Sequence, residues 1–351
     1  MRETIKKHKT QYDSKNVFDS ILKFGDQCTD AYEAASKIHL PKEYEQVENI
    51  VLLGMGGSAL GGHIIQSQSI VKKPFEVSSA YHLPEYVNEK TLIIATSYSG
   101  NTEETVTATK EAILRGAKII GITTGGELLA LMQKNNFPVY HIDTKNNPCN
   151  QPRFGVGYML WGTLIMLSKL SLIDNDLKSD FKESITAITH SMETMGNLDN
   201  LEFEYLWENL KGRIPLILGA EHLSETGHFI QNQINETAKT FAVYYEIPEI
   251  HHHLLEGLKH PLNLKEKIIF LLLRSDMYSD KIDKRMRITE EILKTREIPA
   301  ITFKAESTSE IAQVCETLAY GAFISYYCAL LNELDPSDIP WVNYLKEQLK
   351  N

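Results

Sequence analysis

The chain has 351 residues, which is too long for one ordinary hydrophobic core and suggests two domains of about 150 residues each. Its apolar fraction of 42% and charged fraction of 23% are those of an ordinary soluble globular protein. The net charge of −10 argues against a large basic face for binding nucleic acid.

The first half of the chain alternates predicted strands with predicted helices. Apolar residues at helical spacing over 14–38 predict one or two leading helices. Short apolar runs then predict strands at 50–53, 75–77, 91–96, 118–123 and 138–142, separated by helices at 59–68, 102–115 and 127–135. Strand–helix alternation with short connections is typical of a doubly wound parallel sheet.

The same alternation restarts in the second half, without hydroxyl-rich strand ends. A polar loop at 143–153, which we expect to be exposed, and an apolar helix at 156–172 come between the halves. Strands are then predicted at 214–218, 242–245, 267–273 and 300–303, and helices at 225–237, 280–296, 311–333 and 339–349. We therefore expect an α/β protein with two doubly wound parallel-sheet domains, each of three α/β/α layers. The expected bounds are 1–45 for a leading helical segment, 46–165 for the first domain, and 166–351 for the second domain with its C-terminal helices.

The cysteines and the start of the chain predict a cytoplasmic protein. None of the four cysteines is spaced as Cys-x-x-Cys, which argues against a zinc site. So few cysteines in a long chain fit a reducing compartment. No apolar h-region opens the sequence, so we expect no signal peptide, and the apolar runs are too short to span a bilayer.

Two predicted strands end in small and hydroxylated residues and turn directly into helices. These turns are Gly54–Ser58 and Ser97–Thr102. Such turns direct backbone N–H groups, the positive end of a helix and Ser or Thr hydroxyls toward one point. The three hydroxyls of the second turn can surround one tetrahedral anion, so we expect a phosphate site there.

Other interpretations of these turns are weaker. The glycines alone would fit a dinucleotide site, but Ser58 adds a hydroxyl, and only Glu76 lies about where an acid for the ribose is expected. No Lys-Ser/Thr pair follows the glycines, which excludes a Walker A loop. The remaining interpretation is a helix cap without a ligand, and the presence of two such turns weakens it.

The residues of the two turns, Gly56–Ser58 and Ser97–Thr105, resemble the sugar isomerase (SIS) fold of phosphosugar enzymes. The whole chain is similar to the bifunctional phosphoglucose/phosphomannose isomerases. The further matches are Asn150–Arg153, Gln233–Lys239, Ile247–Glu249 with the histidines after it, and the segment from Tyr326 to Lys346. The resemblance implies two SIS domains of flavodoxin-like topology. It also implies an enzyme that converts glucose 6-phosphate, and mannose 6-phosphate too, to and from fructose 6-phosphate through an enediolate.

The resemblance also implies the site residues. The phosphate would be held by Gly57, Ser58, Ser97, Ser99 and Thr102.

Four further residues would do the chemistry. Glu236 resembles the base that moves a proton between C2 and C1, and the amides near it suggest a polar helix face turned inward. His252 and Lys346 would open the sugar ring. Arg153 would face the developing enediolate oxygen, where a fixed guanidinium stabilises the charge.

The histidine run departs from the family pattern. His251 and His253 stand where the family has asparagines beside its catalytic histidine, and Leu254 stands where an acid is common. The run could instead be an exposed loop or an adventitious metal site, although adjacent histidines in a strand point to opposite sides. In the family this histidine reaches across a dimer interface, so the resemblance implies a homodimer in which His252 serves the partner's site.

The sequence therefore predicts a cytoplasmic, homodimeric hexose 6-phosphate isomerase of glycolysis and gluconeogenesis. We expect it to need no metal or nucleotide and to bind neither nucleic acid nor membrane. Two alternatives stay open: another SIS enzyme, such as a glucosamine synthase or a different phosphosugar isomerase, and a noncatalytic phosphosugar sensor. A synthase needs a glutaminase domain, and we expect none before residue 45. A sensor can lose the base, whereas this chain combines Glu236, His252, Arg153 and Lys346.

Overall fold

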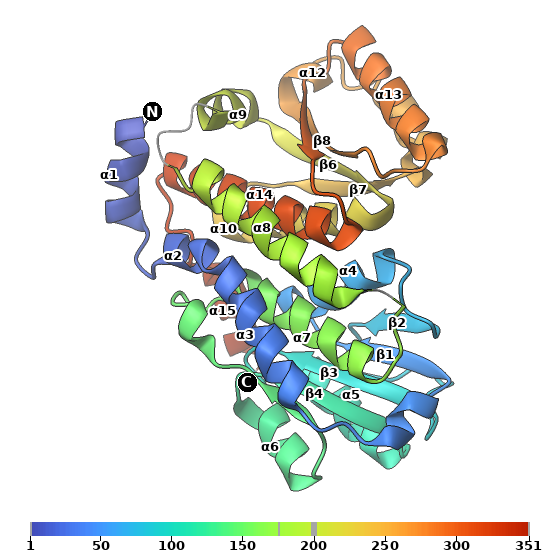
Figure 1. Cartoon of the computed structure of the whole chain (residues 1–351). Coiled ribbons are helices and arrows are strands. Elements are labelled where there is room, and N and C mark those ends of the chain that lie inside the picture. The colour runs from blue at the N-terminus through green and yellow to red at the C-terminus, as the bar shows by residue number, and fades with distance from the viewer. Residues whose placement is uncertain (1, 175, 198–201, 350–351) are drawn as a thin grey trace. The chain divides into compact units, whose positions relative to one another are not determined.

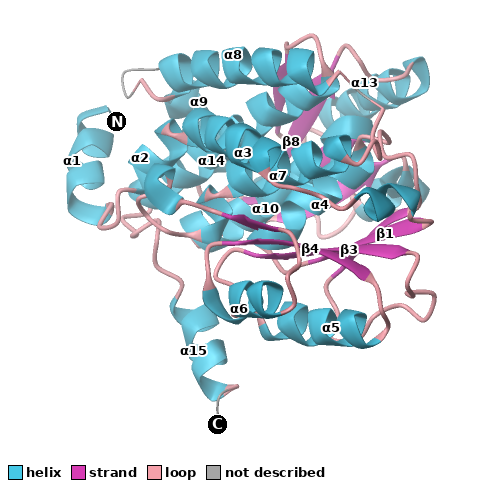
Figure 2. Ribbon diagram, turned by 60° about the horizontal axis from the view of Figure 1, so that its bottom comes forward, coloured by secondary structure: helices cyan, strands magenta, loops and turns pink. Residues whose placement is uncertain are grey.

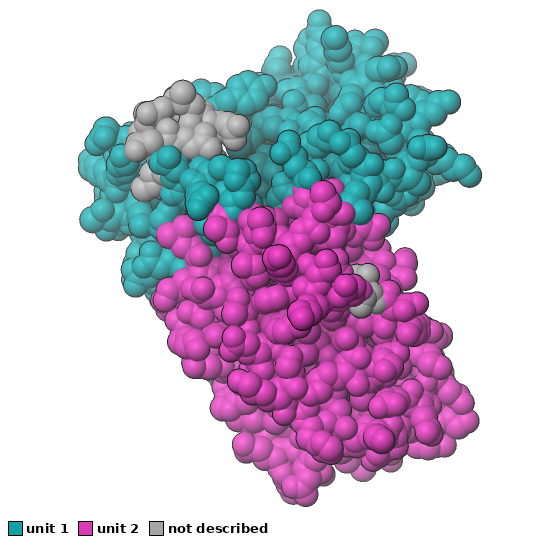
Figure 3. Space-filling view, in the orientation of Figure 1, with its two compact units in different colours: residues 1–21, 190–306, 315–351 teal, residues 22–189, 307–314 magenta. Residues whose placement is uncertain are grey.

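The computed structural model describes residues 2–174, 176–197 and 202–349 (Figure 1). The chain forms two compact units, which Figure 3 colours separately. Unit 1 consists of Met1–Ile21, His190–Glu306 and Cys315–Asn351, and unit 2 consists of Leu22–Thr189 and Ser307–Val314. The domain bounds expected from the sequence stay a prediction.

Unit 2 is built on a five-stranded parallel sheet with the strand order β2-β1-β3-β4-β5. Its strands are β1 (Asn49–Leu53), β2 (Phe75–Ser78), β3 (Thr91–Ser97), β4 (Lys118–Thr123) and β5 (Val139–His141). Every residue of the central β3 is buried, because helices cover a parallel sheet on both faces. The predicted doubly wound sheet is confirmed, and its strand order is the flavodoxin-like one.

Helices cover both faces of this sheet, as Figure 2 shows. On one face lie α5 (Glu103–Leu114) and α6 (Gly126–Lys134), and on the other lie α3 (Phe24–Lys37), α4 (Gly57–Ser67) and α7 (Val156–Lys169). The predicted three layers are therefore present in unit 2.

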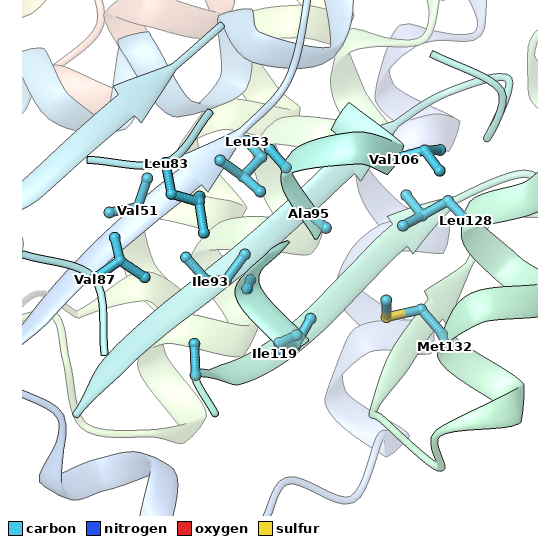
Figure 4. Close-up of a cluster of buried hydrophobic side chains, with 13 residues drawn as sticks. Val51, Leu53, Leu83, Val87, Ile93, Ala95, Val106, Ile119, Leu128 and Met132 are labelled. Carbon is cyan, nitrogen blue, oxygen red and sulfur yellow. The ribbon is translucent and has the colours of Figure 1, made fainter. Parts of the chain in front are cut away.

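Alternate side chains of the strands face α5 and α6, because successive residues of a strand point to opposite faces. Val51 of β1, Ile93 of β3 and Ile119 of β4 belong to one buried cluster with Val106 of α5 and Met132 of α6 (Figure 4). This core fixes the positions along the sheet at which β1 and β3 end and the following helices begin.

Unit 1 contains a second parallel sheet, with the order β7-β6-β8-β9. Its strands are β6 (Ile214–Ala220), β7 (Val243–Ile247), β8 (Ile268–Ser275) and β9 (Ala300–Ala305). This order repeats that of the first four strands of unit 2. The predicted duplication of the architecture is confirmed, with four strands in place of five.

The remaining α-helices lie mostly in unit 1. They are α1 (Arg2–Tyr12), α2 (Val17–Leu22), α8 (Leu177–Met195), α9 (Glu202–Leu210), α10 (Ser224–Ala238), α11 (Leu254–Gly257), α12 (Leu264–Lys267), α13 (Asp280–Thr295), α14 (Glu310–Leu331) and α15 (Pro340–Gln348). By length and composition α14 could cross a bilayer, but 83% of its apolar window is buried in the protein, as in a core helix.

Five of these helices have no counterpart among the elements predicted from the sequence, namely α1, α8, α9 and the four-residue helices α11 and α12. In α8 the apolar residues are separated by many serines and threonines. These residues are neutral to unfavourable in helices and obscure the periodic pattern. In the structure α8 packs against α7 through aromatic side chains. The ring centre of Phe181 in α8 lies 4.9 Å from that of Trp161 in α7.

The two sheets differ at the carboxyl ends of their strands. After β6 the chain carries Glu221, whose carboxylate accepts the Ser279 N–H at 2.9 Å and the Ser279 hydroxyl at 2.5 Å. Ser279 is the N-cap residue of α13. A carboxylate of the chain itself therefore occupies the place where an external anion would meet that helix.

We expect Glu221→Ala to lower the free energy of unfolding by about 0.5–2 kcal/mol, because the start of α13 loses its bound carboxylate. Urea unfolding of the two variants Glu221→Ala and Glu221→Gln measures this. Glu221 has a φ of +45°, a conformation that both variants share, and Gln keeps one acceptor oxygen, so Glu221→Gln should lose less stability than Glu221→Ala. Unchanged stability in both variants would show that the carboxylate does not stabilise α13.

Candidate active site

The two turns that bear glycines and hydroxyls lie next to each other in unit 2. β1 and β3 are neighbouring parallel strands, with Leu53 paired to Ala95, so their turns open at the same edge of the sheet. From β1 the chain continues to β2 on one side, and from β3 it continues to β4 on the other. This is the switch point at which doubly wound sheets bind their ligands.

The hydroxyls of both turns make hydrogen bonds to residues of the second turn. The Oγ of Ser97 lies 2.8 Å from the Oγ1 of Thr102 and accepts the Gly100 N–H at 3.1 Å. The Oγ of Ser58 accepts the Tyr98 N–H at 2.9 Å. Since Ser58 is the acceptor in this bond, its own O–H can donate to a ligand oxygen. The structure therefore brings Ser58, Ser97 and Thr102 together.

The predicted residue Ser99 lies on the same turn but is exposed. Its Oγ accepts the Asn101 N–H at 3.3 Å, which shapes the tip of the turn. The side chain of Ser99 can reach a ligand only from the solvent side, in contrast to the buried Ser97 and Ser58.

Both helices that follow the turns begin without a side-chain cap from their N-cap residues. The N-cap of α4 is Gly56, which has no side chain. The N-cap of α5 is Thr102, whose Oγ1 faces Ser97 instead of the first N–H groups of the helix. Two helix N-termini at one sheet edge direct N–H groups and positive dipole ends toward an anion.

A third strand end packs against this pair, and the predicted site did not include it. Thr124, which follows β4, donates its hydroxyl to the Tyr98 carbonyl at 2.6 Å. The Glu127 N–H at the start of α6 donates to Asn101 Oδ1 at 3.0 Å. The segment 123–126 also places hydroxyls and glycines between a strand and a helix, so the same sequence signal could have identified it.

The loop at 143–153 is exposed only in part, so the prediction that it is exposed holds for Asp143, Lys145, Pro148 and Asn150 but is wrong for its buried residues. Asn147, Cys149 and Arg153 are all buried. The Asn147 side-chain amide donates to the Tyr98 hydroxyl at 2.7 Å and to the Gln151 carbonyl at 3.0 Å. Polar side chains can be buried when they are hydrogen-bonded inside the protein, and composition alone does not show where that happens.

Arg153 lies beside the first turn. It belongs to the 3₁₀ turn η3 (Pro152–Phe154) and is only 4% exposed. A Cβ added to Gly57 would lie 3.2 Å from the Arg153 backbone nitrogen, so η3 packs directly on the start of α4. The Arg153 guanidinium donates to Gln151 Oε1 at 3.2 Å. A buried guanidinium adds positive potential that water screens only weakly.

Glu236 lies near the end of α10 in unit 1. Its side chain is half-buried, while Gln233 and Thr237 on the same helix are fully buried. Gln233 Oε1 accepts the Ser325 hydroxyl of α14 at 3.1 Å. The polar face of α10 is therefore turned inward, as the sequence predicted.

The histidine run forms the 3₁₀ turn η5 (Glu249–His252), directly after β7. His252 is exposed, whereas His251 is half-buried and His253 bonds Glu249 at 2.8 Å between Nε2 and Oε2. In the described part of the chain, no three His, Cys, Asp or Glu side chains form a group that could hold a metal ion.

Lys346 lies on α15 in unit 1 and is exposed, as are all the described residues of that helix. The predicted site is thus divided between the units. Unit 2 carries the phosphate residues and Arg153, while unit 1 carries Glu236, His252 and Lys346 on three different elements. The roles of these residues stay predictions.

Comparisons with known proteins cover most of the chain. Residues 43–143 match the SIS domain family, and residues 202–349 match the bacterial phospho-glucose isomerase C-terminal SIS domain. A curated bifunctional phosphoglucose/phosphomannose isomerase from Caldicellulosiruptor bescii is 30% identical over 340 residues, covering 95% of this chain and 98% of that protein. The D-glucosamine-6-phosphate 4-epimerase of Sulfolobus acidocaldarius is 27% identical over 64% of this chain and 68% of its own length.

A solved structure shows the same fold. The hypothetical protein TT0462 from Thermus thermophilus superimposes with a TM-score of 0.75 at 16% sequence identity. The match covers 99% of this chain and 93% of the other chain.

The close contact between the second and third turns predicts a different cost for two similar glycines. Gly100 and Gly116 have φ of +70° and +73°. A Cβ at Gly100 would lie 1.8 Å from the Gly125 carbonyl oxygen, whereas at Gly116 its nearest neighbour would be 3.8 Å away. We expect Gly116→Ala to lower the free energy of unfolding by about 1–2 kcal/mol through backbone strain. Gly100→Ala should lower the free energy of unfolding by about 1–3 kcal/mol more than Gly116→Ala does, because its added methyl group overpacks the turn.

Urea unfolding and the affinity for inorganic phosphate measure this pair of variants. Gly100→Ala should also weaken phosphate binding, while Gly116→Ala, which lies outside the turns, should leave it unchanged. Similar values for the two variants in both measurements would contradict the packing of the turns described here.

Proposed function

This chain belongs to the bifunctional phosphoglucose/phosphomannose isomerase family, and we propose that it interconverts glucose 6-phosphate and mannose 6-phosphate with fructose 6-phosphate. The reaction is an isomerisation within one sugar, in which a proton moves between C2 and C1 through an enediolate. The proposal rests first on the phosphate site, because every one of these substrates carries the same 6-phosphate.

The observation that supports this most is the cluster of Ser58, Ser97 and Thr102 at the switch point of unit 2. Three hydroxyls and the N-termini of α4 and α5 meet at one sheet edge. A phosphate dianion offers three terminal oxygens, which accept hydrogen bonds from such donors, and it favours the positive ends of helices. We propose Gly57 and Ser99 as further contacts, through the backbone at the start of α4 and from the solvent side.

We propose that Glu236 is the base that carries the proton between the two carbons. Its half-buried position on the inward face of α10 fits a carboxylate that meets a substrate rather than bulk water. General acid–base catalysis of this kind contributes about 10²- to 10⁴-fold to a rate. The proposal requires that the phosphate site leaves C1 and C2 of a bound sugar within reach of this carboxylate.

Ring opening and charge stabilisation fall to the other three residues. We propose that His252 and Lys346 open the ring, since both side chains are exposed and can meet a substrate. Arg153 would stabilise the enediolate oxygen. Its burial beside the first turn supports this, because a preorganised cation in a poorly hydrated place is worth several kcal/mol to a developing negative charge.

We further propose a cytoplasmic homodimer in which His252 completes the partner's site. The apolar side chains of α15 support a second copy as partner. Trp341 is 80% exposed, and Tyr344 and Leu345 are more than half exposed, beside Lys346 on the same helix. Burial of such side chains against another subunit would remove them from water. All four cysteines are buried and lie outside disulfide bonds, as fits a reducing cytoplasm.

Two other functions remain as competitors. The relation to the 4-epimerase of Sulfolobus acidocaldarius favours, as a second candidate, a different reaction on an amino sugar phosphate. A noncatalytic sensor would bind the same esters without turnover. Coupled assays on glucose, mannose and glucosamine 6-phosphates separate these functions, and the proposal expects fructose 6-phosphate from the first two.

For Glu236→Gln we expect kcat to fall about 100- to 10,000-fold, because the amide cannot accept the proton from C2. Glucose 6-phosphate at 100 times its dissociation constant should still raise the free energy of unfolding by about 2.7 kcal/mol. Glu208→Gln, which removes an exposed carboxylate from α9, is the matched control and should keep full activity. Full turnover by Glu236→Gln would remove this residue from the mechanism.

A further inference from the structure

The three consecutive histidines of η5 have different surroundings. His252 is exposed, and His253 bonds the exposed Glu249 of its own turn. An exposed ion pair of this kind contributes little to the free energy of unfolding. His251 is the member that connects the turn to another element, because both of its ring nitrogens meet residues of α13.

The hydrogen bonds around His251 form a closed set. Thr289 donates its single hydroxyl proton to the Arg285 carbonyl at 2.8 Å. The Thr289 Oγ1 must therefore accept from His251 Nε2, which lies 2.8 Å away. Arg285 has only donors, so His251 Nδ1 accepts from the Arg285 guanidinium at 3.1 Å. Only a neutral ring with its proton on Nε2 satisfies all three bonds.

This contact lies one residue from the proposed ring-opening group. The backbone of the turn is closed on both sides of position 252, since the His251 N–H donates to the Pro248 carbonyl at 3.1 Å and the His253 N–H donates to the Ile250 carbonyl at 3.2 Å. Ile250 is completely buried. The bonds of His251 and the burial of Ile250 thus fix the turn, while the side chain of His252 remains exposed.

We infer that His251 is a positioning residue, which holds the turn carrying His252 against α13 through Arg285 and Thr289. The inference rests on the proposed function only in giving His252 a role in ring opening. It explains what a histidine does at the position where the sequence departs from the family's asparagine. An asparagine offers one acceptor and one donor on a shorter side chain, whereas a histidine reaches both Arg285 and Thr289.

The same geometry makes the contact sensitive to acid. A second proton on the ring would sit on Nδ1 and face the Arg285 guanidinium. Burial, then the charge of Arg285, then His252, lower the pKa of His251 from its usual 6.5.

The acids of η5 and β7 do not contribute to the pKa shift of His251. Glu249 bonds His253. Glu246 of β7, the strand that packs on α13, has its pKa raised by burial and by Glu225. Among the described residues, no carboxylate is therefore one of the charges that shift the pKa of His251.

The folded protein binds fewer protons at His251 than the unfolded chain does. The stability that this contact contributes is therefore complete above the unfolded pKa of about 6.5, and it is lost as the pH falls from there toward the lower folded pKa. Acidification should therefore weaken the contact that holds the turn of His252 to α13.

A double-mutant cycle on the full-length protein tests the inference. We expect His251→Ala to lower kcat/KM for fructose 6-phosphate about tenfold, with unchanged stabilisation by inorganic phosphate. In a His252→Ala background the same substitution should change kcat/KM by less than about twofold, because a residue that acts through His252 has nothing left to position. Equal losses in both backgrounds, or no loss in either, would overturn the inference.

His251→Asn and His251→Gln provide the matched controls. Asn Oδ1 replaces the acceptor at Nδ1, and Gln Nε2 replaces the donor at Nε2, and neither side chain titrates. Both should retain more activity at pH 8 than His251→Ala. Both should also lose less stability than the native protein between pH 7.5 and 5.5. An unchanged pH profile in both variants would show that the contact does not act as described.

The pH-dependent unfolding also separates this inference from the proposed function. If the native protein does not turn over hexose 6-phosphates, the proposed function fails. The contact is then judged by stability alone. A smaller loss of unfolding free energy between pH 7.5 and 5.5 in His251→Asn than in the native protein supports the contact, and an equal loss overturns it.

Discussion

The arrangement of unit 2 depends on the parallel pairing of β1 with β3. Helices cover both faces of these two strands, and the pairing brings their carboxyl ends side by side at one edge of the sheet. Each strand passes directly into a helix, so the positive ends of α4 and α5 and the hydroxyls of Ser58, Ser97 and Thr102 converge. Local turn chemistry alone would give separate helix caps, and only the sheet brings the two turns together as the proposed phosphate site.

The duplicated architecture is used in two ways. Unit 2 leaves its switch point lined by hydroxyls, whereas unit 1 fills the corresponding place with the carboxylate of Glu221. Unit 1 instead carries the groups proposed to move protons, on α10, η5 and α15. Under the proposed roles, one unit would supply binding and the other would supply acid–base chemistry.

The sequence predicted the strands and most helices because parallel strands are continuous apolar runs with abrupt ends. It missed α8, whose many serines and threonines interrupt the apolar pattern. It also misjudged the burial of Asn147, whose side-chain amide bonds the Tyr98 hydroxyl and the Gln151 carbonyl. The turns that carry Ser58, Ser97 and Thr102 could be located from the sequence because the spacing of their residues is local. The contact of His251 with Arg285 and Thr289 could not, since it joins residues far apart in the chain.

The most direct test of the central claim is a crystal structure of this protein with fructose 6-phosphate bound. We predict that the phosphate lies within hydrogen-bonding distance of Ser97, Thr102 and the first N–H groups of α4, with C1 and C2 of the sugar facing the carboxylate of Glu236. A phosphate bound away from the turns after β1 and β3, or reactive carbons out of reach of Glu236, would contradict this view of the site.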